Sequence, residues 1–433
     1  MIEESRRGGT GWSAADLSAL AASLVEVTAD PGLTADCLSQ VEALEALKAA
    51  AAAAQARVTA EYADRERARL ARVRGGSRRR GREPAVGSQL GIARRESPAR
   101  GEFLVGAASA LVHDLPGTLA ALERGVLTEE RALLVVRETD DLSAEDRLRV
   151  DVELWHGPSS GCAATLGTDQ LRQHVRRLVT GADPVAATRR RARARAGRHV
   201  AGRLLGDGTG RITAVVRSEH YGPVMQALTE AAAEARAAGD PRTPDQVRSD
   251  VVVRRLTGVD PVEPRRIDLR LVLGLDSLLG TADAPGLVPG SGHLPAAVCR
   301  SLLAEAFERH EVTVRRLFAL PEDGQLVAME KTSRCFDGLL AEMIRIRDAE
   351  TCRTPWCDAS IRHLDHVVPA REDGRTSYEN GQGLCERCNH VKETPGWTSW
   401  VGFRGGGPEI GTRTSSGRCA YGKPPPMPVP GSL

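Results

Sequence analysis

The sequence predicts a mainly α protein with an α+β middle region and a small C-terminal module that is held together by zinc. Three observations support this prediction. Apolar residues recur at helical spacing through the first half of the chain, and runs of strand length first appear at Arg211. Near the C-terminus, four cysteines form two closely spaced pairs, at positions 352, 357, 385 and 388.

Length and composition indicate a globular protein of several domains. The 433 residues suffice for two or three domains, and apolar and charged fractions of 41% and 27% are those of folded proteins. We expect a helical or flexible segment at 1–39, a large helical to α+β domain at 40–340 and a zinc-stapled module at 345–401. The Gly/Pro-rich tail at 402–433 reads as disordered or extended.

The first half of the chain reads as a series of helices with recognisable start signals. Ser13 is the predicted N-cap of a helix over 13–30, and Thr128 and Ser143, each followed by acidic residues, begin two more. Helical spacing also predicts helices over 40–73 and 98–112 and from Pro116. An Arg/Gly-rich linker at 75–97 interrupts this series.

The middle of the chain mixes helices and strands. After a Gly/Ser break at 157–161, helical spacing predicts helices at 168–179, 221–238, 244–257 and 335–349. Strand patterns begin at Arg211 (RITAVV) and cover 268–275 (DLRLVLGL). A hairpin is predicted over 312–331, around a Pro-Glu-Asp-Gly turn.

The N-terminus and the cysteines favour a soluble protein of a reducing compartment. The first residues carry charge and lack the apolar core of a signal peptide, and the alanine run at 49–54 is too weakly apolar to span a bilayer. The nine cysteines are odd in number, and five of them are scattered, at positions 37, 162, 299, 335 and 419. We therefore expect a cytoplasmic location and no membrane partner.

Positive charge is concentrated in two arginine clusters. The net charge is only +2, and all but four of the 59 basic residues are arginine, which suits phosphate binding but also follows from a GC-rich genome. Twelve arginines lie between Arg65 and Arg100, and seven lie between Arg189 and Arg203 with no acid among them. Either cluster could follow nucleic-acid phosphates, or could form a solvated helix face and a linker.

The two cysteine pairs have the spacing of zinc knuckles. They read C-x4-C (Cys352, Cys357) and C-x2-C (Cys385, Cys388), with 27 residues between them, and such pairs reach one tetrahedral zinc from two sides. Four unrelated buried thiols are the weaker alternative. Zinc closed by four sulfurs has no open position, so this ion would hold the fold and leave catalysis to other residues.

An Asp-His dipeptide between the knuckles is the candidate for chemistry. In RHLDHVVP, the run Leu364–Val368 has the pattern of a strand that Pro369 ends. Asp365 and His366 then point to opposite faces unless a bulge re-aims one of them. A carboxylate suits Mg²⁺ or Mn²⁺, and histidine can take a proton from water near neutral pH. Such a dipeptide is usually a solvated surface feature, but the flanking knuckles favour a functional site.

Residues 347–400 resemble the HNH endonuclease module, in which a hairpin and a helix clasp one divalent ion in a ββα-metal fold. The resemblance implies that His366 is the general base that activates water against a phosphodiester. It also implies that Asp365 binds the catalytic Mg²⁺ or Mn²⁺ and that Asn380, in the run YENGQGLC, positions the base.

The end of the motif offers two residues for the last metal ligand. In the HNH family this part reads C-H-x-x-K or C-N-x-x-K, and Cys388, Asn389 and Lys392 match the second form, which implies Asn389. Its neighbour His390 is the alternative. Lys392 could contact the DNA backbone or only solvate a helix. His363 could touch phosphate, although support of Asp365 from the same strand face is the stronger interpretation.

Residues from about 40 to 340 resemble the large helical region called domain of unknown function 222, found with a C-terminal HNH module in the actinobacterial 13E12 repeat family. The matching runs are LPGTLAALERGVLTEERALLV, GHLPAAVCRSL, VRRLFALPEDGQLVAMEKTSR, NGQGLCERCNHVKETPGW and, in the tail, TRTSSGRCAYGKPPPMP. This resemblance gives the large domain no biochemical role.

The function predicted from these residues is metal-dependent hydrolysis of phosphodiester bonds in double-stranded DNA, with zinc as a structural ion. A zinc-stapled DNA-binding protein with weak or no cleavage is the alternative, and a structural zinc protein that ignores nucleic acid is a third. The set of Asp365, His366 and Asn380 favours the enzyme, because a pure binding module has no evident use for it. A homodimer would make cleavage of both strands easier for a single-ion site.

Overall fold

The structure is a computed structural model that describes residues 12–28, 34–73, 84–156, 163–205, 209–258, 271–289, 292–308, 335–404 and 407–424. The chain divides into two compact units. One consists of Met1–Val58 and Ala108–Asp183, and the other of Thr59–Ala107 and Pro184–Leu433. The described part is mostly helical with small sheets, which agrees with the predicted class.

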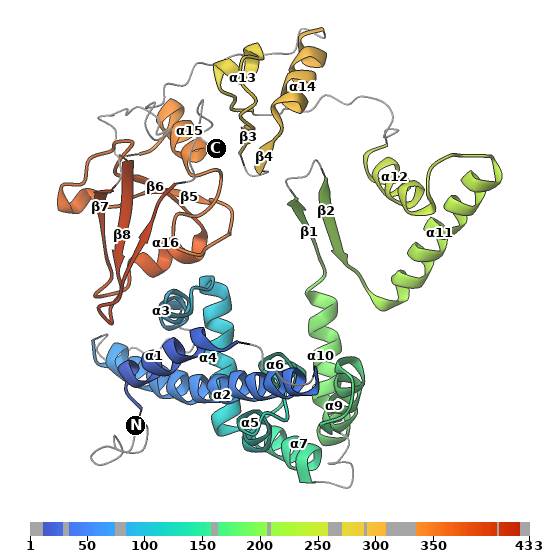
Figure 1. The fold of residues 1–433 in the computed structure, drawn as a ribbon. Helices are drawn as coiled ribbons and strands as arrows, with labels where there is room; N and C mark the ends of the chain where they lie inside the picture. The colour runs from blue at the N-terminus through green and yellow to red at the C-terminus, as the bar shows by residue number, and fades with distance from the viewer. Residues whose placement is uncertain are drawn as a thin grey trace. The chain divides into compact units, whose positions relative to one another are not determined.

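The first unit is helical (Figure 1). Its elements are α1 (Ala14–Ser23), η2 (Leu24–Glu26), the start of α2 (Thr34–Val73), the end of α4 (Pro98–His113), α5 (Pro116–Glu123), α6 (Glu129–Glu138), α7 (Ala144–His156) and α9 (Thr168–Ala182). Ser13 caps α1, since its hydroxyl accepts from the amide of Asp16 at 3.2 Å and the Asp16 carboxylate accepts from the amide of Ser13 at 2.8 Å. Thr128 caps α6 through its side chain. The helices predicted in this unit are confirmed.

A buried carboxylate ties α7 to the start of α5. Asp151 is 1% exposed and accepts hydrogen bonds from the amide of Gly117 at 2.5 Å and from the amide and hydroxyl of Thr118 at 2.9 and 2.6 Å. Burial raises the pKa of this carboxyl, and the three bonds offset part of the cost of burying it. Leucine and valine fill the surrounding core, as a sequence with only 3% aromatic residues requires.

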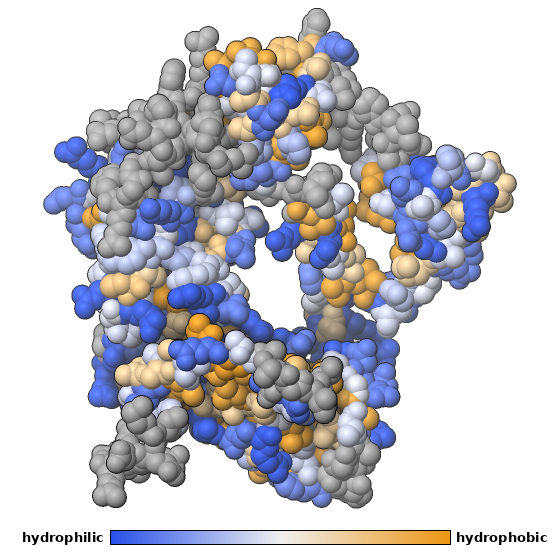
Figure 2. Space-filling view, viewed as in Figure 1, coloured by the Kyte–Doolittle hydropathy of each residue, from blue (hydrophilic) through white to orange (hydrophobic). Residues whose placement is uncertain are grey.

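The second unit contains several small layers. Its elements up to residue 308, beyond those shared with the first unit, are α3 (Pro84–Arg94), α10 (Pro184–Ala196), β1 (His199–Leu204), β2 (Gly210–Val215), α11 (Ser218–Ala237), α12 (Pro244–Thr257), α13 (Leu275–Leu279), β3 (Gly286–Val288), β4 (Gly292–Leu294) and α14 (Ala296–Glu308). β1 and β2 form an antiparallel hairpin. Apolar side chains of this hairpin reach the surface (Figure 2), among them Val200, 73% exposed, and Ile212, 59% exposed.

The C-terminal part of the second unit carries the residues singled out by the sequence. Its elements are α15 (Gly338–Arg347), β5 (His363–His366), η3 (Ala370–Glu372), β6 (Gly381–Leu384), α16 (Glu386–Lys392), β7 (Thr398–Arg404), β8 (Gly407–Arg413) and β9 (Cys419–Gly422). β5 and β6 pair antiparallel, with Asp365 opposite Gln382 and His366 opposite Gly381, and α16 packs against both strands. β8 pairs with β7 on one side and with β9 on the other.

A buried ionic network fastens α15 to β6. The Asp348 carboxylate is fully buried and accepts from Arg347 Nε at 2.7 Å, from Arg353 Nη1 at 2.9 Å and from the amide of Gly383 at 2.8 Å. Arg347 also donates to the carbonyl oxygens of Tyr378 and Gly381, at 2.5 and 2.8 Å. Because both arginines share one carboxylate, removal of Asp348 would leave two buried cations without a counter-ion.

A second polar cluster joins α2, α3 and the turn between β8 and β9. One carboxylate, that of Glu66, accepts from Arg69 Nε at 2.7 Å, from Gln89 Nε2 at 3.0 Å and from Ser415 Oγ at 2.9 Å. The hydrogen bonds from Arg69 are the main reason why the pKa of Glu66 falls to about 2. These contacts bring residues from the beginning and the end of the chain into one unit.

Length and hydropathy show which helices of the described residues could cross a membrane. No single helix there is both long enough and apolar enough to cross a bilayer, and one bent pair, α4 with α5 at 100° to each other, has the length and composition only when the two helices are taken together.

Two predictions of local structure are wrong in the described residues. The linker predicted at 75–97 contains α3, which begins at Pro84, because proline fits the first turn of a helix. In the strand predicted at 268–275, Val272 makes a single bridge to Leu287, and Leu275 instead begins α13. The hairpin predicted at 312–331 and the break at 157–161 lie outside the described residues.

The tail is more ordered than its composition suggests. Residues 407–413 and 419–422 are strands of the β7–β8–β9 sheet, so the tail is extended there, as one of the two predicted alternatives, but it is paired in a sheet. Gly411 is needed in this sheet, because a Cβ atom at that position would lie 2.2 Å from the indole of Trp400 on the neighbouring strand. The glycine content that indicated disorder therefore makes room for an aromatic ring.

Candidate active site and metal centre

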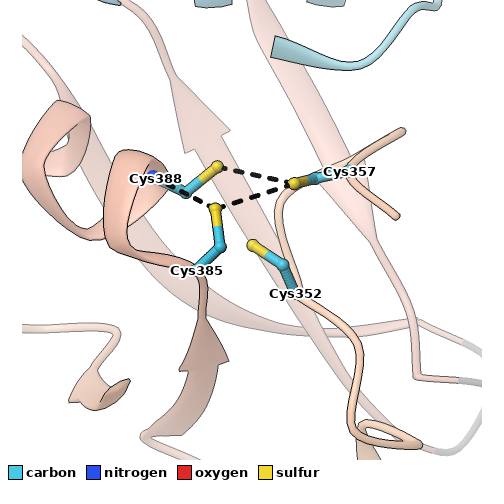
Figure 3. A group of neighbouring side chains, drawn as sticks. All are labelled: Cys352, Cys357, Cys385 and Cys388. Atoms are coloured by element: carbon cyan, nitrogen blue, oxygen red, sulfur yellow. Dashed lines mark hydrogen bonds between the residues drawn. The ribbon is translucent and has the colours of Figure 1, made fainter. Parts of the chain in front are cut away.

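The four cysteines of the two knuckles come together in one buried cluster (Figure 3). Cys352 and Cys357 lie in the loop after α15, Cys385 is the N-cap of α16, and Cys388 lies in the first turn of that helix. All four sulfur atoms lie within 4.8 Å of one another. The sulfur of Cys357 is 3.9 Å from that of Cys385 and 3.8 Å from that of Cys388.

These distances fit a tetrahedral zinc ion. Zinc–sulfur bonds of about 2.3 Å at tetrahedral angles place neighbouring sulfurs about 3.8 Å apart. The amide of Cys388 donates to Cys385 Sγ at 3.4 Å, a bond that favours the thiolate form of Cys385. The residues present thus fit zinc in number, type and spacing, and the predicted knuckles are confirmed as one candidate site.

The four thiols of this cluster shift one another's pKa values. A hydrogen bond with Cys357 lowers the pKa of Cys352 to about 7, and one with Cys352 lowers the pKa of Cys385. Hydrogen bonds with Cys352 and other cluster sulfurs raise the pKa of Cys357 and of Cys388, and repulsion from the neighbouring thiolate adds to this increase. A divalent cation would remove this repulsion and let all four sulfurs bind as thiolates.

Asp365 and His366 lie at the end of β5 and face opposite ways, as strand geometry requires. The His366 ring lies against Phe336, with 4.6 Å between the ring centroids, and its Nε2 is 3.0 Å from Thr376 Oγ1. His366 is 9% exposed. Asp365 is on the other face, where its carboxylate accepts a hydrogen bond from Lys392 of α16.

Lys392 holds β5 and α16 together at this point. Its ammonium group donates both to the Asp365 carboxylate and to the backbone carbonyl of His366. The Lys392 side chain is 9% exposed and that of Asp365 is 29% exposed, so the carboxylate remains partly open to solvent. In the structure Lys392 forms an ion pair with Asp365, and its predicted contact with the DNA backbone stays a prediction.

Asn380 uses its side chain to close the loop that follows β5. Its Oδ1 accepts from the amide of Val368 at 2.8 Å, and its Nδ2 donates to the carbonyls of Val368 and Arg375 at 3.0 and 2.8 Å. Its own carbonyl accepts from the amide of Val367, the residue after His366, at 2.7 Å. Asn380 therefore fixes the backbone on which His366 sits.

The remaining candidates differ in exposure. Asn389 is half-buried and lies three residues before Lys392, one helical turn away on the same face of α16, whereas His390 is exposed. His363 is exposed at the start of β5, and strand alternation puts it on the face of Asp365. Among the described residues, the four cysteines are the one group of three or more Cys, His, Asp or Glu side chains close enough to share an ion.

Sequence reasoning missed three residues that contact the Asp-His pair. Thr376 and Phe336 touch the imidazole, and Gln382 Nε2 donates to the carbonyl of His366 at 3.3 Å. Phe336 lies 30 positions before His366 in the sequence, and nothing in its residue type or spacing indicates that it packs against the imidazole. Gln382 could have been found from the strand pattern, since a hairpin joining Asp365 to the GQGL run places it opposite that carboxylate.

Comparison with known proteins adds one match. The family described as HNH endonuclease matches residues 350–394, which contain all four cysteines and the Asp-His pair. No curated protein and no solved structure matches the chain. The matched segment does not reach residues 40–340, so their likeness to domain of unknown function 222, like the domain boundaries, stays a prediction.

Proposed function

We propose, on the premise that residues 350–394 are an HNH endonuclease domain, that this protein is a metal-dependent nuclease that hydrolyses DNA phosphodiester bonds. One observation carries the proposal: Asp365 and His366 end a strand that Lys392 and Asn380 hold in place, beside a four-cysteine cluster that fits structural zinc. We interpret β5, β6 and α16 as the hairpin and helix of a ββα-metal module.

Asp365 and Asn389 are the oxygen donors that we assign to a catalytic Mg²⁺ or Mn²⁺. The Asp365 carboxylate is partly exposed, and Asn389 lies on the helix face that also presents Lys392 to it. Such a small donor set suits Mg²⁺, which commonly takes one or two protein ligands and completes its shell with water and phosphate oxygens. We favour Asn389 over His390 because His390 is exposed on another part of the helix surface.

Each side chain then has a distinct task. When bound, a divalent ion supplies positive charge to the scissile phosphate and the leaving oxygen. His366 takes the proton from the attacking water, and the Thr376 hydroxyl holds the imidazole in one orientation. Asn380 positions His366 through the backbone of Val367 and Val368. We assign the exposed His363 to a DNA phosphate, and Lys392 to a second one once a metal ion has displaced its ammonium group from Asp365.

The burial of His366 favours a second candidate, a DNA-binding protein with weak or no cleavage. Its Nε2 is already hydrogen-bonded to Thr376 and its ring lies under Phe336, so water reaches that nitrogen only if Thr376 releases it. The same protein would bind DNA through its arginines, with an affinity that falls steeply as salt increases. We propose the cytoplasm as its location, where reduced cysteines can bind zinc.

Nicking of supercoiled plasmid separates the two candidates. The enzyme should produce open circles with Mg²⁺ or Mn²⁺ and none with EDTA, and His366→Ala should lower the rate by about 10² to 10⁴. His220→Ala, at an exposed histidine of α11 outside the matched segment, serves as the control and should retain most of the activity. Cleavage that persists in both EDTA and His366→Ala would exclude the proposed mechanism.

A further inference from the structure

A cavity of about 450 Å³ lies beside the first cysteine pair. Residues 348–349 and 351–358 form one side of it, and residues 421–423 of β9 and its end form the other. Its volume is within the range of about 300 to 1,000 Å³ found for small-ligand sites. None of the residues assigned to catalysis lines it, so the proposed hydrolysis gives this space no role.

Two partly exposed aromatic side chains line the cavity. Trp356 is 41% exposed and Tyr421 is 44% exposed. The Tyr421 and Trp400 rings are nearly perpendicular, with 6.0 Å between their centroids. Gly422 lies so close to the knuckle loop that a Cβ atom there would be 2.9 Å from the Arg353 carbonyl. β9 is therefore held against the loop that carries Trp356.

Trp356 occupies a backbone position that suits glycine. Its φ angle is +60°, in the left-handed region that glycine enters without steric cost and a bulky side chain does not. Burial does not explain the choice of tryptophan, because a large part of the side chain is exposed. A strained position that keeps an exposed aromatic ring points to a contact made by that ring.

Arg353 supplies a hydrogen-bond donor that lacks a partner. Its side chain is 4% exposed and lines the cavity. Nη1 donates to Asp348 at 2.9 Å and Nη2 to the Gly422 carbonyl at 3.2 Å, but the buried Nε–H has no hydrogen-bond partner among the described residues. An unpaired buried donor is costly, and an acceptor on a bound ligand would satisfy it.

The charges around the cavity favour a neutral ligand. Asp358 and Asp348 line it together with the first pair of cluster thiols, and Arg347 and Arg353 are already engaged by Asp348. A phosphate would meet Asp358 and thiolate sulfurs, whereas a planar base with ring acceptors would meet aromatic faces and the Arg353 donor. Lys423, at the other side, is exposed and can contact the flanking backbone.

We propose that this cavity binds an unpaired nucleobase of the DNA substrate, stacked on Trp356 and Tyr421 and hydrogen-bonded to Arg353. The inference rests on DNA as the partner in the proposed function. A base inside a duplex is stacked and paired on both sides, so the site selects DNA with a bulged, flipped or single-stranded nucleotide. It would direct the nuclease to such structures.

The test uses the full chain, zinc-loaded and with His366→Ala, so that no cleavage interferes. Its probe is a duplex with one bulged 2-aminopurine, compared with the same duplex in which that base is paired. We expect about ten-fold tighter binding of the bulged duplex, the size of one stacking contact, and quenched 2-aminopurine fluorescence. Trp356→Gly and, separately, Tyr421→Ala should abolish both effects.

Glycine at position 356 relieves the backbone strain, so this variant should unfold at the same or a higher temperature than its parent. Trp12→Gly, which removes a tryptophan that is 57% exposed in the first unit, is the matched control and should change nothing. Equal binding of both duplexes, or a bulge preference that survives Trp356→Gly, would overturn the proposal. A bulge preference lost in Trp356→Gly supports the site even if wild-type protein fails to nick plasmid.

Discussion

The ammonium group of Lys392 donates one hydrogen bond to the carboxylate of Asp365 and another to the backbone carbonyl of His366. The helix that follows the second knuckle thus neutralises the negative charge that we assign to metal binding. In the proposed mechanism a divalent ion has to compete with this ammonium for Asp365, so the ion pair would set the metal concentration that cleavage needs.

Removal of this competitor should strengthen metal binding. We expect Lys392→Met to bind Mn²⁺ about ten-fold more tightly than wild type, which corresponds to the loss of one charge-assisted hydrogen bond. Electron paramagnetic resonance of free Mn²⁺ in a titration of zinc-loaded protein measures this directly. Lys423→Met, at an exposed lysine, is the control. Unchanged or weaker Mn²⁺ binding in Lys392→Met would show that Asp365 is not the ligand.

Replacement of Asn380 should lower stability, whereas replacement of Asn389 should change the Mg²⁺ requirement. Asn380→Ala removes three side-chain hydrogen bonds from a residue that is 7% exposed and should lower the unfolding free energy by about 1 to 3 kcal/mol. Asn389→Ala, at a half-buried surface position, should leave the melting temperature nearly unchanged and raise the Mg²⁺ concentration required for nicking. Thermal denaturation and metal titration of both variants distinguish a residue that positions His366 from one that binds the metal ion. Similar melting temperatures for the two would contradict the role of Asn380.

Loss of one cluster sulfur should remove the zinc. We expect Cys385→Ser to contain no zinc by elemental analysis and to lose the folded structure of residues 350–394, because removal of a structural ion removes its share of the folding free energy. Cys419→Ser replaces an exposed cysteine outside the cluster and should retain one zinc per chain. Zinc retained at full stoichiometry in Cys385→Ser would locate the ion elsewhere.

Protonation of Glu66 at low pH should lower the folding stability of the second unit. Its pKa falls from the ordinary 4.5 to about 2 in the folded chain, so its contribution is complete above pH 4.5 and is lost as the pH falls from about 4.5 to about 2. This shift corresponds to at most about 3 kcal/mol. Glu66→Gln should flatten the dependence of melting temperature on pH in that window. Glu61→Gln, at an exposed carboxylate five residues earlier in α2, should leave the dependence intact.

The sequence predicted the short-range features of the site, but not the contacts that distant segments make with it. The cysteine spacing and the strand alternation of Asp365 and His366 are short-range patterns, and both are found as predicted. The ion pair of Lys392 was not foreseen, because it depends on how α16 lies across β5, which no spacing in the sequence encodes. The order in the tail was missed for a similar reason: Gly411 indicates disorder until Trp400 is placed against it.

The ion pair between Arg387 of α16 and Glu102 of α4 joins residues that lie 285 positions apart. At a synthesis rate of about 5 to 20 residues per second, α4 leaves the ribosome roughly 15 to 60 s before α16 follows. During that interval its contact surface has no final partner, and the cysteine cluster cannot yet close. Translation speed and chaperone availability therefore bear on the yield of folded protein. The proposed nuclease site, which is complete only when the last quarter of the chain has been made, would stay inactive during synthesis.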